Sequence, residues 1–387
     1  MIKYDFYSQF KQITLLGLAY IILLAGCNKS DQTENSKFEQ FVNNLPAKKF
    51  SVTQINNEET GIPSVNKIVV TPDKKIIVAD FSTWSIHLLD ENGELLDSKG
   101  GEGRGPYEFL GINTFKLYKS TNIVQIYDAK LSRVTFFEIL GDSLNPLKMS
   151  SFKTYQNGHH LKDVYMFNKK SYGLFELNTN ITKVSRDENL RLFSLDENFN
   201  TTDLLMSYAG DEEIEMDLAG NIVMVENPFG FNTRWEFQDS TFIISNSENL
   251  DFTFYNLNNN TQKVHSFNAV PALENLNQVA VSFIKENYPE MISFNSNFEE
   301  NLLERKQLPY FINFGVNEDD IIVSLSNYDT VTKELLILSR KEKYIYKIEI
   351  PSDFFMHGTI GKVIYGVRKD RKHSIDYITM IEYGDQK

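Results

Sequence analysis

Two features of the sequence could bring a charged side chain and a ligand together. The first is the glycine-rich stretch Lys99–Pro106, and the second is Asp80, an acid at the end of an apolar run. A phosphate-binding loop needs a lysine and a serine or threonine after its last glycine, but Gly105 is followed by proline. We therefore interpret the stretch as a crossover between structural units, in which Arg104 could bind an anionic ligand. Asp80 is expected to cap the turn that follows it or, alternatively, to contribute to a cation site on a central axis.

The other acids and the histidines form no recognisable catalytic or metal-binding set. The acids between Asp211 and Asp217 could supply oxygen ligands for calcium, but they lack the Asp/Asn–Gly spacing of a calcium loop. His159 and His160 are adjacent, so a strand would point them to opposite faces. The patterns HExxH and GxSxG are also missing from the sequence. We therefore expect no catalytic residue, no metal and no cofactor.

The single cysteine, Cys27, has a chemistry of its own. It lies just after the apolar run Ile13–Leu24, which is shorter than the roughly 20 residues that span a bilayer and is typical of a signal peptide. The tetrapeptide LAGC that ends at Cys27 resembles the lipobox of bacterial lipoproteins. In that motif the thiol accepts diacylglycerol and a peptidase cuts before the cysteine. The resemblance predicts a signal peptide at residues 1–26 and a mature chain tethered to a membrane by lipid on Cys27.

The residues after the cysteine are polar, so 27–47 is predicted to be a flexible tether. One acyl chain binds a membrane only marginally, whereas a triacylated cysteine gives stable anchoring. In the best-known sorting rule of bacterial lipoproteins, an aspartate after the cysteine retains the protein at the inner membrane. By that resemblance Asn28 implies the outer membrane.

The composition favours a folded β-rich body and argues against nucleic acid as a partner. Hydrophobic residues make up 41% of the 387 residues and aromatic residues 13%, which is enough for a core and is typical of strands. The net charge is −13, and the lysines and arginines are scattered. A polyphosphate would be repelled at long range.

The elements that must position these residues are short strands separated by turns. In the clearest unit, 65–99, strands are predicted at 65–70, 76–80 and 86–90, with a fourth starting at Leu95. A hairpin at Asn92-Gly93 separates the last two, because Asn-Gly accepts positive φ at both central positions. Four antiparallel strands in about 35 residues match one blade of a β-propeller.

The pattern recurs along the chain, and the count comes to six blades. The later units are predicted at 112–153, 161–207, 232–267, 308–350 and 355–383. The last unit supplies only about three strands, so the strand Phe50–Thr53 is expected to complete it and close the ring. Two segments interrupt the repeat and are interpreted as insertions on the propeller rim. They are 211–226, an extra hairpin, and 273–304, with a helix at 276–288.

Within the first unit, the motifs Val78-Ala79-Asp80, Asp90-Glu91-Asn92-Gly93 and Gly103–Phe109 are similar to the NHL-type blades of six-bladed propeller lipoproteins of Gram-negative bacteria. The last of these motifs has the form G-x-G-P-x-E-F. The resemblance is good over 65–111 and implies an all-β, six-bladed propeller of four-stranded antiparallel blades over 48–387, with a lipid anchor.

Two classes of function remain open. The first is a monomeric, non-enzymatic cell-envelope lipoprotein whose propeller binds an envelope protein, peptide or glycan. The second is a metal-dependent hydrolase or lyase, in which acids or histidines from several blades meet on the propeller axis. The two insertions favour the first class, because loops on a rigid scaffold carry recognition. The acid-rich hairpin further favours a basic or neutral partner.

Overall fold

The computed structural model describes most of the propeller body. The described residues are 37–156, 158–177, 188–218, 221–227, 229–272, 280–282, 285, 298–326, 332–342, 344–370 and 372–384. The predicted signal peptide, Cys27, Asn28 and the first part of the tether lie outside them. Within these residues, no helix is both long and apolar enough to cross a membrane.

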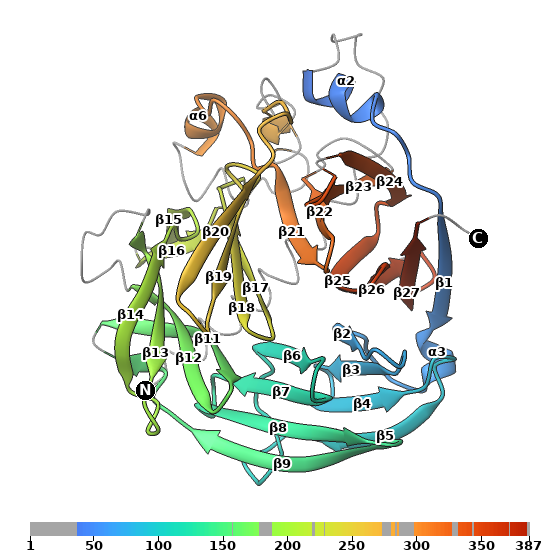
Figure 1. Cartoon of the computed structure of the whole chain (residues 1–387), viewed down its shortest axis with the longest axis vertical. Helices are drawn as coiled ribbons and strands as arrows, with labels where there is room; N and C mark the ends of the chain where they lie inside the picture. Colours follow the sequence, from blue (N-terminus) through green and yellow to red (C-terminus); the bar gives the residue numbers. More distant parts are fainter. Residues whose placement is uncertain are drawn as a thin grey trace.

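Six antiparallel sheets are arranged as blades around a central axis (Figure 1), which confirms the predicted fold class. Blade 1 contains β2 (Lys67–Val70), β3 (Ile76–Asp80), β4 (Ser85–Leu89) and β5 (Leu95–Gly100). Blade 2 contains β6 (Thr114–Tyr118), β7 (Ile123–Asp128), β8 (Arg133–Leu140) and β9 (Ser143–Ser151). Blade 3 contains β10 (Tyr155–Gln156), β11 (His159–Phe167), β12 (Lys170–Leu177), β13 (Leu190–Leu195) and β14 (Thr201–Tyr208). Its fifth strand, the short β10, differs from the predicted four.

The second half of the ring repeats this plan. Blade 4 contains β17 (Thr233–Gln238), β18 (Thr241–Asn246), β19 (Asp251–Asn256) and β20 (Thr261–Ser266). Blade 5 contains β21 (Phe311–Val316), β22 (Asp320–Leu325), β23 (Thr332–Ser339) and β24 (Ile345–Pro351). Blade 6 contains β25 (Phe354–Ile360), β26 (Val363–Asp370), β27 (Ile375–Tyr383) and β1 (Phe50–Asn56).

Strand β1 closes the ring, as the sequence predicts. It pairs with β27 along its whole length, from Phe50 opposite Tyr383 to Asn56 opposite Tyr377. Ile55 is buried and packs beside the Asn-Gly hairpin of blade 1, where Gly93 has a φ of +91°. A Cβ atom at Gly93 would lie 2.4 Å from Cγ2 of Ile55, so this seam requires glycine. The strand that completes blade 6 therefore also contacts blade 1.

The middle strands have apolar runs because each blade packs a neighbour on both faces. All five residues of β3 and all six of β22 are buried. This is why these strands read as continuous apolar stretches instead of alternating ones. The innermost strands of neighbouring blades contact one another around the axis, for example β2 with β6 and β21 with β25.

The two faces of the ring carry different connections. We call the face where the innermost strands β2, β6, β11, β17, β21 and β25 begin the proximal face, and the opposite one the distal face. In an antiparallel blade the fourth strand ends where the first begins, so the crossovers between blades lie on the proximal face. These crossovers include the glycine-rich loop and both predicted insertions. The distal face has only short turns among the described residues.

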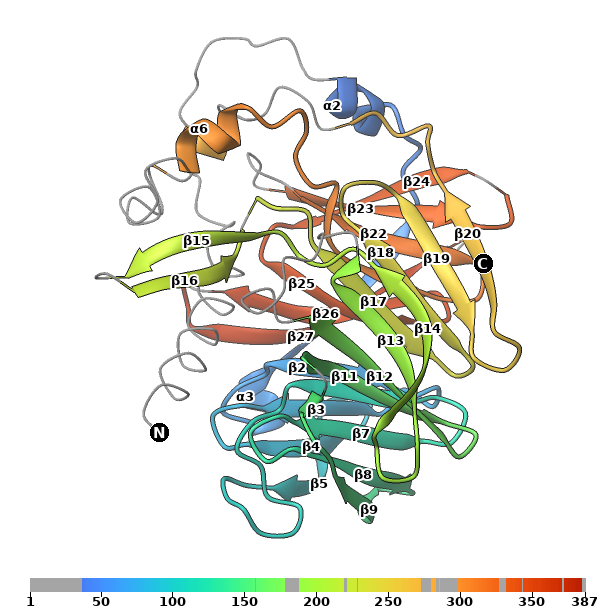
Figure 2. The same cartoon turned by 90° about the vertical axis from the view of Figure 1, so that its left-hand side faces the viewer.

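Both insertions were predicted, and their described parts agree with the prediction to different extents. Residues 211–226 contain the two-stranded hairpin β15 (Glu213–Leu218) and β16 (Asn221–Glu226), which extends away from the blades in Figure 2. In 273–304, residues 280–282 and 285 are helical and α6 spans Phe298–Leu303. The rest of the predicted helix 276–288 lies outside the described residues.

The C-terminal part of the predicted tether, from Lys37 onward, is docked on the body, although its composition predicted a flexible segment. Helix α2 (Lys37–Asn43) buries Phe38 and Val42, which are four residues apart and share one helix face. The ring of Phe38 lies 6.3 Å from that of Tyr310, at the junction of blades 4 and 5. Two or three apolar residues at helical spacing are therefore sufficient to dock this segment, where the overall composition predicted a flexible chain. A second short helix, α3 (Asn57–Thr60), follows β1.

Candidate functional site

Each junction between neighbouring blades is crossed by a side-chain hydrogen bond at the innermost strand. Going round the ring, these bonds are Lys67 Nζ to Asn113 O (2.9 Å), Lys116 Nζ to Asp163, Trp235 Nε1 to Asp163 Oδ2 (2.8 Å), Arg234 Nε to Ile312 O (3.2 Å), Asn313 Nδ2 to Met356 O (3.0 Å) and Ile68 N to His357 Nδ1 (2.9 Å). The axis of the propeller is therefore a polar circle enclosed by apolar blades. These residues form the candidate site, which we call the axial cluster.

Asp163 is the centre of the axial cluster, because three blades meet at its carboxylate. Its Oδ1 atom accepts from the Lys116 ammonium of blade 2 and from the backbone N–H of Val164, and its Oδ2 atom accepts from the Trp235 indole of blade 4. Asp163 is only 1% exposed, so these bonds replace water that the carboxylate has lost. Lys116 also donates to Val164 O at 3.1 Å and lies over the Phe237 ring at 5.0 Å.

Three of the innermost strands are irregular at this level. The register shifts between Leu161 and Asp163 in β11, between Phe311 and Asn313 in β21, and between Met356 and Gly358 in β25. A β-bulge bends a strand and re-aims the side chains beside it. The bulges therefore explain the positions of Asp163, Asn313 and His357, because a regular strand would point these polar side chains elsewhere.

His357 is held in a defined neutral form. Its Nδ1 atom accepts the Ile68 N–H, so the neutral ring carries its proton on Nε2. Burial, and secondarily the nearby Lys67 ammonium, lower the pKa of His357 to about 3. Burial likewise lowers the pKa of Lys67 and Lys116, and the neighbouring Asp163 carboxylate opposes that change.

The distal end of the axis is crossed by a second set of bonds. Lys119 Nζ donates to Thr359 O at 2.7 Å, which joins blade 2 to blade 6. Glu236 accepts from Val316 N at 3.1 Å and from Gln238 Nε2 at 2.8 Å, and burial raises its pKa. These contacts place one ammonium group and one carboxylate at the distal end, whereas Lys67, the first residue of β2, lies at the proximal end.

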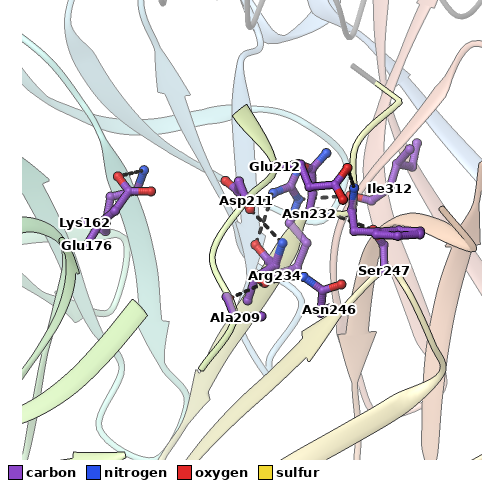
Figure 3. Close-up of polar contacts among 12 residues, drawn as sticks. Lys162, Glu176, Ala209, Asp211, Glu212, Asn232, Arg234, Asn246, Ser247 and Ile312 are labelled. Atoms are coloured by element: carbon purple, nitrogen blue, oxygen red, sulfur yellow. Dashed lines mark hydrogen bonds and ion pairs between the residues drawn. The ribbon is translucent and has the colours of Figure 1, made fainter. Parts of the chain in front are cut away.

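On the proximal face, ion pairs fix the bases of both insertions. Figure 3 shows Asp211, Glu212 and Arg234 at the base of the first. Glu212, at the foot of the hairpin β15–β16, accepts from Arg305 Nη1 at 2.7 Å and from Phe231 N at 3.1 Å. Arg305 follows α6 and also stacks over the Phe231 ring at 4.5 Å. Asp211 accepts from Thr233 N at 2.7 Å and lies 3.8 Å from Arg234. The two insertions are therefore joined to each other and to blade 4.

The glycine-rich stretch is the predicted crossover, and its motif has a packing explanation. Glu108 accepts the Gly105 N–H at 2.7 Å, and a Cβ atom on Gly103 would lie 2.0 Å from the Glu108 carboxylate. Phe109 is fully buried and its N–H bonds Gly101 O at 2.8 Å. The G-x-G-P-x-E-F motif thus folds the crossover around one carboxylate and one ring. Arg104 is exposed on the proximal face, away from the axial cluster.

Asp80 lies at the end of β3, the second strand of blade 1, one strand away from the axis. Its carboxylate accepts from Ser82 N at 2.7 Å, Ser82 Oγ at 2.6 Å and Thr83 Oγ1 at 2.9 Å. The equivalent Asp128 in blade 2 accepts the backbone N–H of Leu131 in its own turn and those of Leu110 and Gly111 in the preceding crossover. The contacts of Asp80 are those of the turn-capping interpretation, and its oxygens are directed to the turn.

The acids and histidines singled out in the sequence do not converge. Asp211 and Glu212 have arginine partners, and His159 and His160 begin β11, opposite Leu177 and Glu176. Across the described part of the chain, no three His, Cys, Asp or Glu side chains lie together in a way that could hold a metal ion. The axial cluster brings together two ammonium groups, the Arg234 guanidinium and one carboxylate, so its charged groups are mainly hydrogen-bond donors and favour an anion.

The sequence matches the model of the DUF5128 family, described as a 6-bladed beta-propeller, over residues 50–301. The chain belongs to this family. No curated protein matches the chain significantly.

Two solved structures resemble this DUF5128 propeller. The first, a protein of Bacteroides fragilis described as exported, is 11% identical with a TM-score of 0.53, and the match covers 92% of this chain and 98% of that one. The second, a DUF4221-family member of Bacteroides vulgatus, is 10% identical with a TM-score of 0.47 and coverage of 88% and 98%. At such identities the first likeness shows the fold alone.

The lowered pKa of His357 predicts that the folded protein loses stability in acid. A histidine that titrates near 6.5 when unfolded and near 3 when folded binds fewer protons in the folded state, so stability falls as the pH drops from 6.5 toward 3. The loss at pH 5 relative to pH 8 is about 2 kcal/mol. His357→Asn retains an acceptor for Ile68 N–H but cannot titrate, so it should be less sensitive to acid by that amount in urea unfolding. The exposed His373, changed to Asn, is the control and should follow the wild type; equal pH sensitivity of all three proteins would contradict a buried neutral His357.

Proposed function

We propose that this protein is a lipid-anchored binding protein of the bacterial cell envelope, which takes a macromolecular partner on its proximal face. The observation that carries the proposal is the Glu212–Arg305 ion pair. It joins the feet of the two largest insertions, which would otherwise be independent loops, into one surface. Loops held on a rigid scaffold are where proteins place recognition.

The charge of the hairpin indicates the chemistry of the partner. Residues 211–226 contain six acids and no lysine or arginine. Asp211 and Glu212 have arginine partners, and Glu215, Asp217 and Glu226 lie on the strands that extend from the ring. A basic or neutral surface of an envelope protein, peptide or glycan would complement this charge, and an anionic one would be repelled.

The anchor rests on the sequence around Cys27, with support from the fold. The described body is a closed ring with one edge of each sheet at the axis, and its first docked residues are those of α2. About ten residues therefore separate Cys27 from the body, enough for a short tether. The exported relative from Bacteroides fragilis is consistent with an envelope location, and Asn28 supports the outer membrane.

The anchor predicts a modified N-terminus. Mass spectrometry of the membrane-extracted protein should show a mature chain that begins at Cys27 and carries lipid. Cys27→Ala should block both the acylation and the cleavage before residue 27. An unmodified wild-type N-terminus, or cleavage at another position, would contradict the anchor.

The binding surface is tested by removing the hairpin without disturbing its foot. Asn227 N already bonds Glu212 O at 2.7 Å, so an Asn-Gly turn can replace 213–226 and preserve the Glu212–Arg305 pair. A second variant retains the hairpin and changes Glu213, Glu215, Asp217 and Glu226 to the matching amides. In quantitative cross-linking on envelope extract, the first variant should lose the wild-type partner and the second should retain it at least tenfold more weakly.

The matched control removes four exposed acids from turns of the distal face, by changing Glu91, Glu94, Glu197 and Glu318 to glutamine. This control should retain the partner, because it changes the net charge equally but leaves the proximal face intact. Retention of the partner by both hairpin variants, or its loss in the control, would contradict the proposed surface.

A further inference from the structure

Among the cations of the axial cluster, Arg234 lies 3.8 Å from Asp211 and Lys116 pairs with Asp163, whereas no carboxylate of the described residues pairs with Lys67. Asp163 is already bonded to Lys116 Nζ, Val164 N and Trp235 Nε1. Lys67, the first residue of β2, donates to one backbone oxygen, Asn113 O, at 2.9 Å. An ammonium group has three N–H donors, and the described residues supply Lys67 with this single acceptor.

The surroundings of Lys67 favour an anion over water. Its side chain is partly exposed but surrounded by protein, and both burial and the nearby Lys116 ammonium lower its pKa. His357 lies close enough for its own pKa to be lowered by Lys67. Because His357 Nδ1 accepts the Ile68 N–H, its Nε2–H is a neutral donor beside that ammonium.

We propose that Lys67 and the Nε2–H of His357 bind the carboxylate of a small ligand that reaches the axis from the proximal face. The unpaired charge is a single positive one, so a monoanion neutralises it, whereas a dianion such as phosphate would bring a second, uncompensated charge into a desolvated site. The ligand approaches from the proximal face because Lys67 lies at the start of β2, on that face, whereas the distal end of the axis is crossed by the Lys119–Thr359 bond.

Trp235, on blade 4, places an aromatic ring at the axis beside Asp163. Its indole is partly exposed, and the bond from its Nε1 to Asp163 fixes the ring orientation. A fixed aromatic ring that lines the axis suits a ligand whose carboxylate is carried on a small ring or chain. This small-ligand site uses none of the hairpin residues. A negative result for the macromolecular partner proposed above would therefore leave the small-ligand proposal unaffected, and the reverse also holds.

The test measures binding of D-glucuronate, D-glucose and inorganic phosphate to the mature chain by titration calorimetry or ligand-observed NMR. Glucuronate should bind saturably, and glucose, which lacks the carboxylate, should bind at least tenfold more weakly. Phosphate at pH 8, where it is mainly a dianion, should also bind more weakly than glucuronate. Glucose that binds as well as glucuronate, phosphate that binds more tightly, or no saturable binding of glucuronate would overturn the proposal.

Variants then locate the site. Lys67→Gln should weaken glucuronate binding at least tenfold, and Lys67→Arg, which retains the charge, should bind within a few-fold of wild type. Lys75→Gln is the matched control, because Lys75 is a partly buried lysine in the distal turn after β2 and pairs with Asp142 at 3.1 Å. Unchanged binding in a folded Lys67→Gln protein would overturn the assignment. If that variant does not fold, loss of binding in His357→Asn, with Lys75→Gln unaffected, decides the same question.

Discussion

The carboxylate of Asp163 is the constraint on which the centre of this propeller depends. A buried carboxylate is costly unless every oxygen is paired, and Asp163 pairs with Lys116 of blade 2 and Trp235 of blade 4 from its own place in blade 3. Three blades are thus fixed by one group, and the circle of axial hydrogen bonds continues from them through blades 5, 6 and 1. The apolar blade-to-blade packing holds the ring together, and the axial bonds determine which side chains point into its centre.

Closure of the ring separates two faces with different connections. Strand β1 pairs with the edge of β27 and completes blade 6, and the short distal turns leave little irregular chain on that face among the described residues. The proximal face carries the glycine-rich crossover, the acidic hairpin and the second insertion, with the Glu212–Arg305 pair between the last two. An anionic outer surface and a cationic axis therefore lie on the same side of the molecule, which suits a macromolecular partner at the rim and a small anion at the centre.

Much of the fold was predictable because its signals are local. Alternating turns and apolar runs located β3 at its observed limits, and the strand deficit of the last unit predicted the role of β1. The motif G-x-G-P-x-E-F marked a real crossover, although its glycines serve Glu108 packing more directly than any ligand. The axial cluster was missed, because its members are 289 residues apart at the Ile68–His357 bond and meet only through ring closure. A local signal did exist: Lys67 and Lys116 are each the single charge in the first strand of their repeats. The bulge beside Asp163 is not encoded in any pattern of that kind.

The most direct test of this account is a double-mutant cycle on Asp163 and Lys116, followed by urea unfolding of the four proteins. Asp163→Asn preserves the shape of the side chain but leaves the Lys116 ammonium without a counter-charge, so it should destabilise the fold by about 3 kcal/mol. Lys116→Met in the same background removes that ammonium and should recover most of the loss, which gives a coupling energy of about 2 kcal/mol or more between the two positions. Asp163→Asn with wild-type stability, or two changes whose effects simply add, would contradict the claim that this carboxylate organises the axis.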